Sequence, residues 1–87
     1  MNSKKIDPLL LALAHVLRQH RRAQRLSQEE LAFRAGRSMR YVSLLEGGKH
    51  QPTLETLNQI SRVLDIPLSR LISEAENIVA ASKTADG

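Results

Sequence analysis

The chain has 87 residues, of which 41% are hydrophobic, with one Phe, one Tyr, no cysteine and a formal net charge of +4. This length holds one small domain with a modest aliphatic core, and the lack of cysteine excludes disulfides and thiolate metal sites and suits the cytoplasm. No apolar run has the about 20 residues of a membrane-spanning helix, and the eight Arg or Lys against three Glu in residues 15–50 favour a polyanionic partner.

The first predicted helix follows an N-terminal arm, residues 1–7. Asp7 is suited to cap this helix, and Pro8 is suited to its first position, where the missing N–H has no consequence. Apolar residues recur along one stripe to about residue 24, and the opposite side carries Arg18, Arg21, Arg22 and Arg25. Such a basic amphipathic helix is also typical of membrane-surface binding, but here the apolar stripe is needed to cover the helices that follow.

Two short helices are predicted next, at about 28–34 and 39–46. Ser27 can cap the first of them and Ser38 the second. Glu30 stands three residues after Ser27, where its carboxylate can complete a capping box. Gly36 can end that helix in the left-handed conformation. Two helices of about two turns that meet at such a small corner make a helix-turn-helix.

Two longer helices complete the predicted fold. Thr53 can cap a fourth helix that ends near Asp65. Pro67 then interrupts the chain, and a fifth helix is predicted from about Leu68 to Ala80.

Several landmarks in this order resemble one known family. They are SQEELA at residues 27–32, Gly36, YVSLLEGGK at residues 41–49 and PTL at residues 52–54. Together they make roughly residues 13–72 similar to the phage repressor/Cro-type (Xre-like) DNA-binding domain. The resemblance implies an all-α, five-helix, lambda-repressor-like fold over residues 8–80, with the helix-turn-helix in helices 2 and 3. The small polar residues 81–87 are expected to form a disordered tail.

Two positions depart from the family pattern. His20 stands where the family usually has an aliphatic residue, and Arg25 where glycine or a small polar residue often ends the helix. We expect His20 to be half-buried at the edge of the core, with a pH switch as the alternative. His15, His20 and His50 lack the spacing and the acidic partners of a metal site, so we expect no metal and no cofactor.

The expected base contacts lie at the start of helix 3, because the second helix of a helix-turn-helix presents its N-terminal turn to base edges in the major groove. The candidates are Arg37, Ser38, Met39 and Arg40. Arg40 is the expected main contact, since a guanidinium group matches guanine O6 and N7, whereas Arg37 suits a base or a phosphate equally. Leu44 occupies a position where the family often has a polar or basic DNA contact, which weakens any base assignment there.

Phosphate contacts are expected at the edges of the groove. By resemblance, Gln28 lies at the start of helix 2, beside free backbone N–H groups that can bind an anion. Arg34 on the same helix is as easily explained as a solvated residue. The full set of candidates is Gln28, Tyr41, Ser43, Lys49, Arg18 and Arg22.

One such module reads only a few base pairs, so helix-turn-helix proteins usually bind as dimers. Helix 5 carries more apolar residues than so small a core needs, and an exposed apolar patch is typical of a partner surface. The expected dimer interface is Leu71, Ile72, Ala75, Ile78 and Val79.

We therefore predict a small prokaryotic or phage-borne transcription regulator that binds specific double-stranded DNA as a homodimer. The alternative is an antitoxin-like adaptor whose main partner is another protein. The sequence has no glycine-rich phosphate loop and no acidic pair beside a histidine. We therefore expect neither an enzyme nor a small-molecule site. The sequence leaves open whether the regulator is a phage repressor, a restriction–modification controller or an antitoxin, and whether it activates or represses.

Overall fold

The computed structural model describes residues 7–86, with side chains up to Lys83. This part of the chain forms five helices and no strand: α1 (Pro8–Ala23), α2 (Gln28–Ala35), α3 (Met39–Glu46), α4 (Leu54–Leu64) and α5 (Leu68–Asp86). The predicted all-α, five-helix fold is confirmed. Apart from Asp7, the predicted N-terminal arm lies outside the described residues.

The first four helices begin at the predicted caps. The side chains of Asp7, Ser27, Ser38 and Thr53 each accept a hydrogen bond from a backbone N–H in the first turn. The capping box is complete, because the Glu30 N–H donates to Ser27 Oγ at 2.9 Å and the Ser27 N–H donates to Glu30 Oε1 at 2.8 Å. The bond from the Ser27 N–H holds the pKa of the Glu30 carboxyl group below its usual value. Local hydrogen bonding thus fixes where these helices start.

Left-handed residues follow each of the first four helices, and the one after α3 is Gly48, with a φ of +71°. Gly36 has a φ of +72° after α2, as predicted. Arg25 has a φ of +60° after α1, and Asp65 has a φ of +58° after α4. Arg25 therefore adopts a backbone conformation that favours glycine, at the position where the family resemblance implies a small residue.

Helix α5 continues to Asp86, so its predicted end near Ala80 is too early. The added residues include alanines and Lys83, which favour the helix, and no glycine or proline interrupts them. In the described part of the chain, no helix has both the length and the apolar character to cross a membrane.

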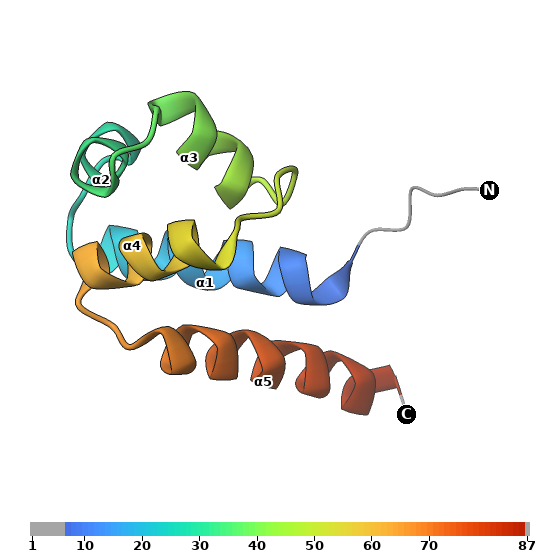
Figure 1. Cartoon of the computed structure of the whole chain (residues 1–87). Coiled ribbons are helices and arrows are strands. Elements are labelled where there is room, and N and C mark those ends of the chain that lie inside the picture. Colours follow the sequence, from blue (N-terminus) through green and yellow to red (C-terminus); the bar gives the residue numbers. More distant parts are fainter. Residues whose placement is uncertain (1–6, 87) are drawn as a thin grey trace.

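The core is aliphatic and draws on every helix. α5 packs mainly along α1, and α2 packs against α3 and α4. In Figure 1, α3 lies at the top and α5 at the bottom, with α1 and α4 between them. The largest fully buried side chains are Val16, Leu17, Leu31, Val42, Leu45, Ile60, Leu64 and Leu71. This packing holds α3 by one side and leaves its other side at the surface.

Candidate nucleic-acid interface

One side of α3 faces solvent, and it begins with Arg40. Val42, Leu45 and Glu46 are buried on the inner side of the helix. Arg40 is exposed and, within residues 7–83, its side chain has no hydrogen bond or ion pair. Its guanidinium group therefore has all of its donors available for an external acceptor.

Arg37 differs from Arg40, because its guanidinium group is engaged within the protein. Its Nη2 donates to Gln59 Oε1 on α4 at 3.1 Å. Its guanidinium carbon lies 5.8 Å from the centroid of the Tyr41 ring, at the distance of a cation–π contact. Its Nε is buried and has no hydrogen-bond partner. Arg37 thus joins the turn before α3 to both α3 and α4.

Tyr41 is half-buried on α3 and contacts a residue from the following loop. The His50 ring packs edge-on against it, with 4.7 Å between the ring centroids and an angle of 73° between the ring planes. The sequence did not indicate this contact, because His50 is separated from Tyr41 by the end of α3 and a turn. The only signal was the pair of glycines at positions 47 and 48, which permit a tight return.

The other side of α3 is held by a buried ionic network centred on Glu46. Arg21 Nε donates to Glu46 Oε2 at 2.7 Å and Arg21 Nη2 donates to Oε1 at 2.9 Å. Gln28 Nε2 donates to Glu46 Oε1 at 3.1 Å, and Arg18 Nε lies 3.5 Å from the same oxygen. The exposed fractions of Arg21 and Glu46 are only 8% and 5%. The network ties α1 and the start of α2 to the last residue of α3.

Because of this network, the prediction that four arginines share one exposed face of α1 is wrong. Arg21 is buried, whereas Arg18 is half-buried and Arg22 and Arg25 are exposed. The cause is Glu46, which is buried at the end of α3 and requires a cationic partner at the helix contact. Burial raises the pKa of the Glu46 carboxyl group, but the hydrogen bonds from Arg21 and Gln28 outweigh it and keep that pKa below its usual value.

The remaining candidates for DNA contact lie at the surface. Ser38 caps α3 with its hydroxyl oxygen, which accepts from the Tyr41 N–H at 3.0 Å, and the residue remains exposed. Met39, Ser43, Lys49 and Arg22 are also exposed. Two of the phosphate candidates, Gln28 and Arg18, lie beside Glu46. Met39 and Ser43 therefore lie at the surface of α3 with Arg40, whereas Gln28 and Arg18 lie by its last residue.

The residues proposed for a dimer interface divide into two groups. Leu71 and Ala75 are 0% exposed, because they face the core. Their assignment to the interface is wrong, since a core residue cannot contact a partner without unfolding. Ile72 and Val79 are half-buried, and Ile78 is 38% exposed.

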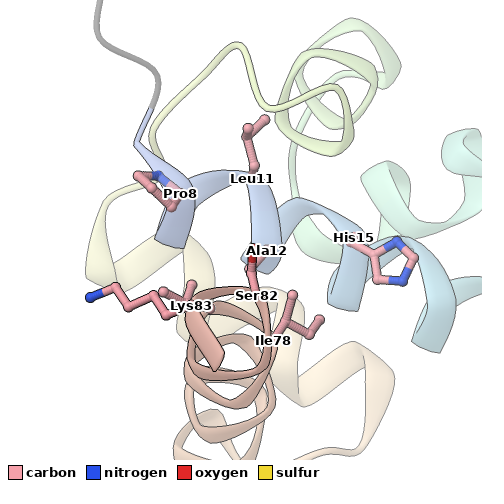
Figure 2. Close-up of a pocket in the computed structure, with 8 residues that line it drawn as sticks. Pro8, Leu11, Ala12, His15, Ile78, Ser82 and Lys83 are labelled. Atoms are coloured by element: carbon pink, nitrogen blue, oxygen red, sulfur yellow. The ribbon is translucent and has the colours of Figure 1, made fainter. Parts of the chain in front are cut away.

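Ile78 and Val79 line an apolar groove between α1 and the C-terminal half of α5 (Figure 2). The groove has a volume of about 460 Å³. Its other lining residues are Pro8, Leu11, Ala12, His15, Ser82 and Lys83. Leu11 is 43% exposed, so both helices present an apolar side chain there.

His20 is half-buried at the edge of the core, as predicted. Its Nε2 and Glu74 Oε1 are 2.8 Å apart, and Arg70 Nε donates to Glu74 Oε2 at 2.9 Å. The contact with His20 is the main cause that holds the pKa of the Glu74 carboxyl group below its usual value. His20 therefore links α1 to α5 and lies away from the exposed side of α3.

The chain is similar in sequence to known helix-turn-helix regulators. The family model for the helix-turn-helix matches residues 17–71. The HTH-type transcriptional regulator y4dL of Sinorhizobium fredii is 35% identical over an alignment of 75 residues, and the match covers 80% of this chain and 38% of y4dL. The chain thus spans well under half of that relative. The regulator y4dJ of the same organism is 36% identical over 56 residues, which cover 64% of this chain and 73% of y4dJ.

Solved structures of two regulators have similar folds. The clp gene regulator ClgR of Corynebacterium glutamicum has a TM-score of 0.86 and 26% identity, covering 94% of this chain and 87% of ClgR. The restriction–modification controller protein C.AhdI of Aeromonas hydrophila has a TM-score of 0.70 and 35% identity, covering 71% of this chain and 94% of C.AhdI. The names of these relatives and neighbours describe regulators, and none describes an enzyme.

Proposed function

This chain belongs to the Xre-like helix-turn-helix family of DNA-binding transcription regulators, and we propose that it binds specific double-stranded DNA as a homodimer with α3 in the major groove. The observation that carries the proposal is the exposed Arg40 side chain, which has no partner within residues 7–83. It lies in the first turn of the second helix of the helix-turn-helix, where base contacts are made.

We assign base reading mainly to Arg40 and positioning to Arg37. An Arg that meets guanine O6 and N7 forms two parallel hydrogen bonds, the commonest specific contact in the major groove. Arg37 would have to give up Gln59 and the Tyr41 ring to reach a base. Ser38, the N-cap of α3, and Met39, its first residue, are both exposed and complete the proposed reading surface.

The phosphate contacts are proposed on both sides of α3. Gln28 and Arg18 lie beside Glu46, on the side where α1 and α2 meet α3, and Arg22 follows Arg18 by one turn of α1. Lys49 and Tyr41 belong to the other side, and Ser43 lies between the two. Gln28 uses one amide hydrogen for Glu46, so its second hydrogen remains available for a phosphate oxygen.

We place the dimer interface on the exposed part of the α1–α5 surface, around Ile78 and Leu11. Two half-sites on one side of a duplex lie about 34 Å apart, so two reading helices must be held in a fixed relation. Figure 1 supports this choice, because α5 and α3 are on opposite sides of the molecule and a partner on α5 leaves α3 uncovered.

One observation favours the alternative of an adaptor that binds another protein. Phe33 on α2 is 84% exposed, and exposed aromatic side chains are frequent anchors of protein interfaces. The adaptor function predicts a partner on α2 and no preference for any DNA sequence.

DNA selection followed by a salt titration tests the proposal. The selected duplex should bind tightly, and log affinity should fall with log salt by about 0.9 per neutralised phosphate. Arg40→Ala should lose about 1–3 kcal/mol on the selected duplex and little on random DNA. Arg34→Ala, which removes an exposed arginine of α2, is the matched control and should retain the preference. Weak binding without sequence preference would instead support the adaptor.

A further inference from the structure

We propose that His50 is a further contact to the DNA backbone and that it makes the affinity for DNA rise as the pH falls from about 8 to about 6. The inference rests on the proposed function, because it requires a duplex that lies along α3. It assigns a role to a residue that has no part in the core or in the other proposed contacts.

The loop after α3 returns to the helix and brings His50 to its side. The N–H groups of Gly47, Gly48 and Lys49 donate to carbonyl groups in the last turn of α3, at 3.0, 3.1 and 2.9 Å. Gly48 has a φ of +71°, a conformation that permits this return. The next residue is His50, whose ring is then fixed edge-on against Tyr41. The backbone of the loop thus brings His50 beside α3, where its ring packs against Tyr41.

DNA bound along α3 would run past the side of the helix where His50 lies. At 100° per residue, Tyr41 and Glu46 fall on opposite sides of the exposed line through Arg40 and Ser43. A helix in the major groove has a phosphate strand on each side of it. Gln28 and Arg18 lie by the Glu46 side, whereas His50 and Lys49 lie by the Tyr41 side.

The charges around His50 favour a phosphate as its partner. Tyr41 packs against it from α3, Lys49 precedes it in the loop, and Arg37 lies on the Tyr41 ring. The acidic residues nearest along the chain are Glu46, which is buried and paired with Arg21, and Glu55, in the first turn of α4. Every ion pair within residues 7–83 goes to Glu46 or Glu74, so no carboxylate is paired with His50.

Proton uptake would follow from a phosphate contact. A histidine changes its charge between about pH 5 and 8. A phosphate bound beside a histidine favours its positively charged form. Because the bound state then holds more protons than the free state, the affinity must rise as the pH falls.

The test measures binding of the full chain to its selected duplex by fluorescence anisotropy at about pH 6 and about pH 8, at constant ionic strength. The wild-type affinity should rise about three- to tenfold at the lower pH, and the salt dependence should steepen by about 0.9, the effect of one added phosphate contact. His50→Gln should bind like the wild type at the higher pH and gain little at the lower one. His20→Gln, which changes a histidine that links α1 to α5 away from the exposed side of α3, should keep the full pH effect.

Two outcomes overturn the inference and are distinguishable. If the wild type binds the selected duplex but His50→Gln keeps the whole pH dependence, only the role of His50 is wrong. If the wild type prefers no duplex at either pH, the proposed function fails, and the role of His50 fails with it. Circular dichroism melts of each variant at both pH values separate a loss of binding from a loss of folding.

Discussion

The guanidinium group of Arg21 and the carboxylate of Glu46 meet side by side inside the protein, through two hydrogen bonds of 2.7 and 2.9 Å. Arg21 Nη1 also donates to the Leu26 carbonyl oxygen at 2.7 Å. The pair thus joins α1, the segment before α2 and the end of α3. It fixes the helix that we propose to read DNA.

Breaking this pair from one side should destabilise the protein strongly. Arg21→Met leaves the Glu46 carboxylate buried without its main partner, and such a loss typically costs about 3–5 kcal/mol. Urea denaturation would measure it, with Arg22→Met as the control for an exposed arginine of the same helix. The double variant Arg21→Met/Glu46→Leu removes both charges and should be more stable than Arg21→Met alone. A double variant as unstable as the sum of the two single changes would contradict a coupled pair.

Acid should destabilise the protein through the same carboxylate. Because the pKa of Glu46 is lower in the folded state than its usual value, the unfolded chain takes up the proton first. The contribution to stability is therefore complete above about pH 5 and is lost as the pH falls through the folded-state pKa. Glu46→Gln should be less stable than the wild type at neutral pH, and the difference in unfolding free energy should narrow towards about pH 3. Glu29→Gln, an exposed glutamate of α2, should show no such convergence.

Replacing Arg25 by glycine should stabilise the fold. The left-handed conformation costs a non-glycine residue about 1–2 kcal/mol, and the greater freedom of glycine in the unfolded chain offsets part of this. With a φ of +60° at Arg25, we expect Arg25→Gly to gain about 0.5–1 kcal/mol, or a few degrees in Tm. Arg25→Ala, which keeps the Cβ atom, should not give this gain. Equal melting temperatures for the glycine and alanine variants would show that φ is not the cause.

Disrupting the apolar α1–α5 groove should convert dimers into monomers. Ile78→Asp introduces a charge at a partly exposed apolar position, where a partner would have to bury it at a cost of several kcal/mol. Sedimentation equilibrium at micromolar concentration should give a dimer for the wild type and a monomer for the variant. Asn77→Asp adds the same charge at the neighbouring exposed residue and should leave the dimer intact. A monomeric wild type would refute the dimer proposal outright.

The sequence by itself determined where the helices begin and what kind of fold they form. Asp7, Ser27 and Thr53 act through hydrogen bonds to residues two or three positions away, so their roles are readable from local spacing. The end of α5 was less readable, because alanine and lysine favour helix whether or not they pack.

Only the tertiary structure decided how the charged and apolar faces are used. Periodicity shows that residues share a face, but it does not say which helix covers that face. For this reason it could not show that Arg21 is buried against Glu46, 25 residues later. The same limit hid the burial of Leu71 and Ala75 and the contact of His50 with Tyr41. Each of these depends on the angle at which two helices, or a helix and a loop, meet, and packing of the whole core sets that angle.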